Sequence, residues 1–402
     1  MFKGSALYEV QIRQDDRWRM EAAFTEEQAA LSCARVQLTV PGVQEVKVFK
    51  SRSLAGLALQ TAVFHRKAPE QKSRPLGLSG TAEGAPYCTD LAELYGFESR
   101  VVIGRLLRQF LDRFQVTPTE LLHGWGHARR LDEQGTLMGA AIHAVARHHG
   151  DAHKVAVAGR VKELRALVDR ALVRARDAAG RKSLPAFDGA DLAATSRRIE
   201  RAVGPEEHDF VFLAQLTQHL AGTSSLVGKM ELLVKLMARS DDERLSALLE
   251  GVVADGLGSA DVVKELLGAQ PSLAGGLCAL ADALYGRRPG EKDVPVRPLL
   301  ACIGALAAAG RAPGCRIVLV ERVRSALNGD QPLDRRDARA EATLVEGIVA
   351  RLKGPDGTLL GGAETERALA RRLLRNRQAI LRQQGMHDIA DRLPATFRPG
   401  EG

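Results

Sequence analysis

The sequence predicts a mainly α-helical protein that begins with a small domain of mixed α and β structure (α+β). Over residues 1–66, polar and apolar side chains alternate with a period of two, as they do in strands. From about Thr89 onward, the apolar residues recur with helical spacing instead. Aromatic residues make up only 4% of the chain, while Ala, Leu, Arg and Gly are abundant, which favours a helical protein over a large β-protein.

The first 66 residues predict the element order ββαββ. A hairpin is expected over residues 7–24, where two turn-forming aspartates interrupt the alternation. Thr25 and Gln28 have the spacing of a capping box and predict the start of a helix, which Pro41 ends. Renewed alternation over residues 46–63 predicts a second pair of strands.

A four-stranded sheet with a single helix has one face that its own domain does not cover. This second face must be solvated or must contact something else. We therefore expect the small domain to dock to a partner or to the rest of the chain, with Tyr8 and Trp18 as interaction residues.

A stretch rich in Pro, Gly, Ser and charged residues follows this domain and predicts a flexible linker at residues 67–88. The expected domains on either side are the α+β domain at residues 1–66, a helical domain at 89–185, a helical array at 186–395 and a tail at 396–402.

Helix start signals are clear after the linker. Apolar residues on one face predict an amphipathic helix over residues 103–114. Thr117, Pro118 and Glu120 then supply the N-cap, N1 and N3 residues of the next helix. Longer helices are expected over residues 137–149 and 155–178.

The remainder of the chain predicts many short helices joined by short turns, as in an all-α multi-helix array. Ser240 and Glu243 form a second capping-box pattern within it. No consensus repeat is present, so the architecture is expected to be an irregular solenoid or an orthogonal bundle. Helix starts are predicted near Pro205, Thr223, Ser240, Ser259, Ser272, Pro295, Pro313, Asp334 and Gly362.

Composition limits the classes of protein to which the chain can belong. The five cysteines are widely spaced and form no CxxC pair, which favours reduced thiols in the cytoplasm. The longest apolar stretches run to about a dozen residues, well short of the ~20 that cross a bilayer, and the N-terminus lacks the pattern of a signal peptide. The formal net charge of +8 favours acidic partners, although acids are interspersed with the arginines.

Histidines gather between residues 123 and 153 and raise the question of a metal site. His123 and His127 are spaced i and i+4, so on one helix they would point the same way and could share a metal. The candidates for a third ligand are Asp132, Glu133 and His143. However, two glycines within the pair weaken a helix there, and no HExxH pattern is present. We favour ordinary surface and helix-end histidines.

Other catalytic patterns are missing. Residues 222–229 approach the pattern of a phosphate-binding loop, but the spacing is wrong by one residue and Met230 stands where a Ser or Thr is needed. No Ser/His/Asp or Cys/His arrangement can be paired from the sequence. We predict no catalytic residue and no cofactor.

An arginine-rich helix is expected over residues 364–384. Its leucines and isoleucine form a stripe, so the arginines are predicted to face outward, where they could meet phosphate or an acidic protein surface. The helix contains no aromatic residue for stacking on bases, which weakens the case for nucleic acid. The predicted interaction residues are Arg367, Arg371, Arg372 and Arg375.

We therefore predict a non-enzymatic, cytoplasmic protein-interaction or scaffold (adaptor) protein with protein partners and no integral membrane association. Two alternatives remain. One is a nucleic-acid-associated regulator that uses the arginine-rich helices near residues 160–176 and 367–382. The other is a metal-dependent enzyme at residues 123–153.

Overall fold

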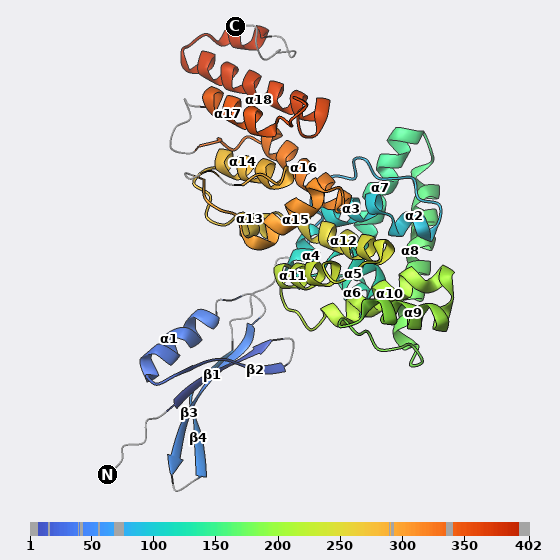
Figure 1. Ribbon diagram of the computed structural model, residues 1–402, viewed down its shortest axis with the longest axis vertical. Helices are drawn as coiled ribbons and strands as arrows, with labels where there is room; N and C mark the ends of the chain where they lie inside the picture. The colour runs from blue at the N-terminus through green and yellow to red at the C-terminus, as the bar shows by residue number, and fades with distance from the viewer. Residues whose placement is uncertain are drawn as a thin grey trace. The chain divides into compact units, whose positions relative to one another are not determined.

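The computed structural model confirms the mainly helical architecture with an N-terminal sheet (Figure 1). The chain divides into two compact units, Met1–Pro75 and Leu76–Gly402. The structure describes residues 7–14, 17–38, 40, 43–54, 57–67, 76–288, 290, 293–334 and 341–393.

The first unit has the predicted order ββαββ and forms a four-stranded antiparallel sheet with the strand order β2-β1-β3-β4. Its core lies between one face of the sheet and α1, where Val10, Ile12, Val48 and Ala34 are fully buried. The elements are β1 (Leu7–Gln14), β2 (Arg17–Phe24), α1 (Glu27–Gln37), β3 (Val43–Leu54) and β4 (Leu57–Lys67).

The start of α1 differs from the prediction. Its N-cap is Glu26, whose side chain accepts no capping hydrogen bond. Because the helix begins later than the Thr25–Gln28 spacing implies, Thr25 lies before the N-cap and the predicted capping box does not form. The predicted end at Pro41 lies outside the described residues, and the helix itself ends at Gln37.

The second unit contains all the remaining helices. Their bounds are α2 (Leu91–Tyr95), α3 (Phe97–Leu106), α4 (Arg108–Phe114), α5 (Pro118–His123), α6 (Trp125–Asp132), α7 (Leu137–His153), α8 (Val157–Gly180), α9 (Leu192–Val203), α10 (Pro205–Leu220), α11 (Leu226–Met237), α12 (Glu243–Leu257), α13 (Ala260–Leu267), α14 (Leu273–Leu284), α15 (Pro298–Ala308), α16 (Pro313–Asn328), α17 (Glu341–Leu352), α18 (Gly362–Gln383) and α19 (His387–Arg392). The predicted boundary between a helical domain at residues 89–185 and a helical array at residues 186–395 remains a prediction.

The second half of the predicted linker belongs to this unit. Ala82, Ala85 and Cys88 are buried, and the backbone N–H of Ser79 donates to the carbonyl of Leu106 at 2.9 Å. Small apolar residues allow this segment to pack closely against the helices. Residues 68–75 of the linker and the predicted tail at 396–402 lie outside the described residues.

Local start signals predicted several helices correctly. Thr117 and Glu120 form the complete capping box: the Glu120 N–H donates to the Thr117 hydroxyl at 3.1 Å, and the Thr117 N–H donates to the Glu120 carboxylate at 2.8 Å. Pro205, Pro313 and Gly362 are the first residues of α10, α16 and α18.

Two predicted helix boundaries are wrong. The helix expected over residues 103–114 is divided between α3 and α4, because Leu107 leaves helical geometry with φ −99° and ψ 19°. The N-cap of α12 is Asp242, and its carboxylate accepts from the Leu245 N–H at 3.1 Å. The Ser240 hydroxyl instead accepts from the Asp242 N–H, so the Ser240–Glu243 capping box does not form.

The helices of the second unit do not contact only their neighbours in sequence. α12 packs on both α11 and α16, α14 packs on α17, and α16 packs on α18. Figure 1 shows α14, α16, α17 and α18 gathered near the C-terminal end of this unit. A regular solenoid stacks each repeat on the next one alone, so these contacts indicate an irregular array.

In the described part of the chain, no single helix is both long and apolar enough to cross a bilayer. Only α15 and α16 taken together reach the required length and composition, and they are bent by 111° where they meet.

A buried ion pair joins distant parts of the second unit. The Lys229 ammonium on α11 lies 2.7 Å from the Glu120 carboxylate on α5, and their side chains are 5% and 0% exposed. Lys229 also donates to the carbonyl of Gln115 at 2.7 Å. A charge taken out of water costs several kcal/mol unless it is paired and hydrogen-bonded, and these contacts meet that requirement.

A second buried carboxylate, that of Asp255, binds Thr119, the neighbour of Glu120 in α5. Asp255 on α12 accepts from the Thr119 N–H at 2.8 Å and from the Thr119 hydroxyl at 2.6 Å. It also accepts from the Arg100 guanidinium on α3 at 3.1 Å. The short helix α5 is therefore held by Lys229 of α11 and by Asp255 of α12, whose charge Arg100 of α3 neutralises.

Removing one charge of the buried pair is expected to destabilise the second unit strongly. Lys229→Met leaves the Glu120 carboxylate buried without its counter-ion, which costs about 3–5 kcal/mol. The double variant Lys229→Met/Glu120→Gln removes both charges and keeps a side-chain acceptor for the Thr117 N–H, so it should recover part of the loss. Urea unfolding followed by circular dichroism measures the free energy of unfolding of the single and the double variant. Equal stability of Lys229→Met and the wild type would contradict this account.

Candidate functional site

The first unit has one sheet face that α1 does not cover. Because side chains alternate along a strand, Trp18, Met20 and Lys47 lie on the face opposite the buried Val10 and Ile12. Trp18 is 38% exposed and Met20 is 65% exposed. We call the surface formed by Arg13, Trp18, Met20, Glu45, Lys47, His65 and Lys67 the open sheet face.

The open sheet face combines apolar area with an excess of basic groups. The Lys47 ammonium lies 4.3 Å from the centre of the Trp18 ring, which is a cation–π contact. Glu45 is buried beneath Arg13, Lys67 and His65, at N···O distances of 3.7, 3.7 and 3.8 Å. Glu9 and Glu45 are acidic residues on this side of the sheet, beside the basic Arg13, Lys47 and Lys67. The small excess of basic groups favours an acidic partner.

Tyr8 does not belong to this surface, contrary to the prediction. It is only 6% exposed, on the face that α1 covers, and its hydroxyl donates to Glu27 on α1 at 3.0 Å. The alternating pattern indicated which residues share a face, but it did not show which face the helix would cover. Trp18 is exposed as expected, and its role in binding remains a prediction.

His123 and His127 do not share a helix, so the geometric basis for a metal site between them is wrong. Gly124 separates α5 from α6, and a side chain at this position would lie 2.7 Å from both the Glu120 carbonyl oxygen and the Thr217 methyl group. His143 is exposed on α7. Among the described residues, no three His, Cys, Asp or Glu side chains come together as a metal site would require.

His123 is part of the packing between helices. Its Nδ1–H donates to the Thr119 carbonyl at 2.8 Å, and its ring lies 5.0 Å from the ring centres of both Tyr95 and Phe210. Burial among these groups lowers the pKa of His123 to about 3, and the positive charges of Arg100 and Arg174 act in the same direction. The imidazole is therefore neutral at physiological pH.

His149 and Arg160 form a buried cluster that the sequence did not reveal. His149 Nε2–H donates to the Ala85 carbonyl at 3.1 Å, and its Nδ1 accepts from the Arg160 Nε–H at 3.1 Å. Arg160 also donates to the Cys88 carbonyl at 2.7 Å and lies 3.9 Å above the Tyr87 ring. Burial lowers the pKa of His149. These contacts fasten residues 85–88 to α7 and α8.

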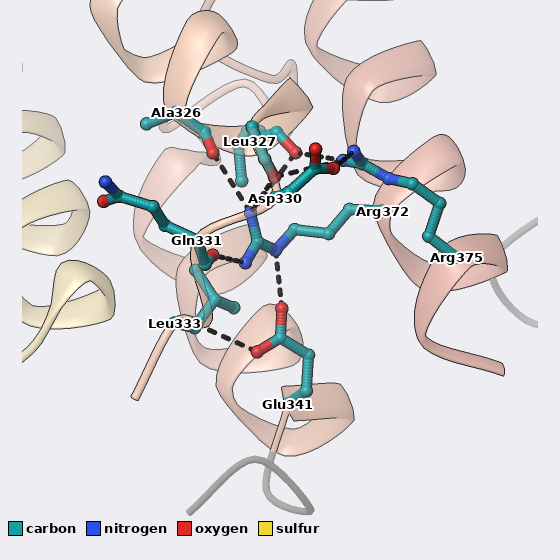
Figure 2. A network of polar contacts seen from close by, with 9 residues as sticks. Ala326, Leu327, Asp330, Gln331, Leu333, Glu341, Arg372 and Arg375 are labelled. Carbon is teal, nitrogen blue, oxygen red and sulfur yellow. Dashed lines mark hydrogen bonds and ion pairs between the residues drawn. The ribbon is translucent and has the colours of Figure 1, made fainter. Parts of the chain in front are cut away.

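The arginine-rich helix α18 places its arginines differently from the prediction. Figure 2 shows the Arg372 guanidinium inserted between α18 and the end of α16. Arg372 is buried, donates to Glu341 at 2.6 Å, and donates to the carbonyls of Ala326 and Gly329 at 3.0 and 3.1 Å. The last carbonyls of a helix lack partners within it, and Arg372 supplies them for α16.

The predicted outward position is therefore wrong for Arg372. Thr365 and Leu369 precede Arg372 in α18 by seven and three residues and are also buried, so Arg372 continues the buried stripe of the helix. Arg375 pairs with Asp330 beside the same turn, Arg367 pairs with Glu364 of its own helix, and Arg371 is exposed. Binding roles for Arg367, Arg371 and Arg375 remain predictions.

The other arginine-rich region, on α8, lines a groove of about 600 Å³ beside α10. Its floor includes Phe210, and the Arg174 guanidinium lies 4.0 Å from the centre of that ring while pairing with Glu207 at 3.0 Å. The charged residues of the groove are of both signs, which does not favour a polyanion. They are Arg170, Arg174, Arg181, Asp169, Asp177 and Glu207.

Comparisons with protein-family models, with curated proteins and with solved structures found no match to this chain. The candidate site therefore depends on geometry alone. The buried charged groups described above are engaged in packing, and the open sheet face is one described surface that combines exposed apolar side chains with basic groups.

Stability is expected to fall as the pH drops below about 6.5, the usual pKa of an unfolded histidine. His123 and His149 have lower pKa values when folded, so unfolding takes up protons in this range. Each contributes a slope of at most ~1.4 kcal/mol per pH unit. His123→Phe should reduce the slope between pH 6.5 and 5, measured by urea unfolding, while His143→Phe should not. An unchanged slope in His123→Phe would contradict the assignment.

Arg372→Gln is expected to destabilise the C-terminal helices by about 3–5 kcal/mol, because Glu341 and several carbonyls lose a buried charged partner. The matched change Arg371→Gln affects an exposed side chain and should stay within about 0.5 kcal/mol of the wild type. Thermal unfolding compares the two. Similar effects of both substitutions would show that Arg372 is not the structural residue.

Proposed function

We propose that this chain is a non-enzymatic, cytoplasmic protein-interaction or adaptor protein whose open sheet face binds an acidic protein surface. The observation that carries the proposal is the exposure of Met20 and Trp18 beside Lys47 on a face that α1 leaves uncovered. Exposed apolar groups next to basic groups provide both buried area and charge complementarity to a partner.

The buried polar groups around α5 support this proposal. The buried Lys229 of α11 pairs with the buried Glu120 of α5, and the buried Asp255 of α12 binds Thr119 of α5. His123 is neutral and packs against aromatic rings. A general base or nucleophile needs access to a substrate, which such positions do not provide. In this proposal, the helical unit is the rigid scaffold that carries the binding domain and offers further surface to other partners.

A cytoplasmic location is supported by cysteine chemistry. The five cysteines are free in the structure, whereas proteins of oxidising compartments commonly form disulfides. Burial raises the pKa of Cys88 and of Cys315, so these thiols stay protonated and unreactive.

The two alternatives carried from the sequence receive less support. The arginines near residues 160–176 and 367–382 include Arg160 and Arg372, which are buried, and others that are paired with acids. This reduces the number of arginines that are free to contact phosphates. The hypothesis of a metal-dependent enzyme is weakened because His123 and His127 lie on two different helices, α5 and α6.

A single charge on the open sheet face should abolish partner binding. Met20→Glu places a negative, hydrated group on a surface expected to meet acidic side chains, so recovery of the partner should fall at least tenfold. Val36→Glu is the matched control, since Val36 is 62% exposed, close to the 65% of Met20, but lies on α1. Quantitative affinity purification from the native cytoplasm after nuclease treatment, with mass spectrometry, measures both.

The outcomes separate the proposals. A protein that is recovered with the wild type and with Val36→Glu, but not with Met20→Glu, supports docking at the open sheet face. Equal recovery with both variants would contradict it. Recovery that disappears on nuclease treatment would favour the nucleic-acid regulator, and stoichiometric metal in untagged protein would favour the enzyme.

A further inference from the structure

An apolar cavity of about 140 Å³, partly open to solvent, lies in the second unit between α3, α5, α6, α7 and α8. Leucine, isoleucine, valine, methionine and alanine side chains form most of its wall. Representative lining residues are Leu106, Leu131, Met138, Ile142, Leu164 and Ala171. Protein interiors are usually packed without voids of this size, so the packing of these helices leaves room for another molecule.

We propose that this cavity binds a small, uncharged, apolar molecule of the size of benzene to indole. Apolar cavities of similar volume in other proteins stay dry and take up benzene or xenon, because water lacks polar partners there. An apolar guest regains the dispersion contacts that the lining side chains would otherwise lack. This inference is independent of the proposed function, because it concerns the helical unit and not the sheet.

The polar groups of the wall also point to an uncharged ligand. Cys88 and Ser99 line the cavity, with their Sγ and Oγ atoms 3.1 Å apart, and the Ser99 hydroxyl donates to the Glu93 carbonyl at 2.6 Å. No charged side chain is among the residues that line it. A charged guest would lose its hydration without finding a counter-ion, whereas an apolar guest with one weak polar group meets no such cost.

One wall of the cavity is the segment 85–88, since Ala85, Pro86 and Cys88 are among the lining residues. His149 and Arg160 fasten this segment to α7 and α8 through its carbonyl groups. The ligand site is thus built by the helices together with a segment that precedes them in sequence.

Benzene is the probe for the test. Methyl NMR of the intact, isotope-labelled protein should show saturable shifts of Met138 and Ile142 as benzene is added, together with an increase in melting temperature. Ala171→Leu fills part of the cavity and should weaken benzene affinity at least tenfold. Ala141→Leu, from the opposite helix α7, provides a second filled variant in case the first fails to fold. Ala166→Leu, exposed on α8, is the control and should bind like the wild type.

The absence of saturable shifts up to the solubility limit of benzene would overturn the proposal. So would an unchanged affinity in a folded filled variant, because binding would then lie elsewhere. Affinity that is lost in the filled variants and kept in Ala166→Leu would support the cavity as the site, whatever the outcome of the partner-binding experiment.

Discussion

The buried ion pair between Glu120 and Lys229 is the contact on which the helical unit depends most. α5 spans only six residues, Pro118–His123, which is far below the ~12–15 residues at which an isolated helix becomes marginally stable. It persists because Lys229 neutralises Glu120 and because Asp255 binds the adjacent Thr119. Unpaired burial of any of these charges is costly, so α3, α5, α11 and α12 must assemble together.

The same constraint explains why arginines are found inside this protein. Arg160 and Arg372 each extend from a helix into an interface and bind backbone carbonyls, of Cys88 and of Ala326 and Gly329. A guanidinium has several donors in a fixed plane and can satisfy several carbonyls at once. These two arginines add to the net positive charge of the chain, but they are buried and cannot bind a partner at the surface. The open sheet face is therefore the surface that we favour for partner binding.

Local chemistry was predictable from the sequence, whereas partners distant in sequence were not. The capping box of Thr117 and Glu120 depends on residues three apart, and the ββαββ order depends on alternation, so both could be recognised. Tyr8 was misplaced because alternation does not show which face a helix covers. Arg372 was misplaced because an arginine was assumed to face water, although its spacing from Leu369 indicated the buried stripe.

Hydrogen exchange of the intact protein, resolved to the residues of α5, tests most directly whether the buried charges are structural. If they lock the helices together, the amides of Leu121 and Leu122 will exchange as slowly as those of the long helices α10 and α12, because opening α5 requires separating the ion pair. Exchange at the rate of an isolated six-residue helix would show that α5 opens independently. Its buried charges would then be available for chemistry, contrary to this account.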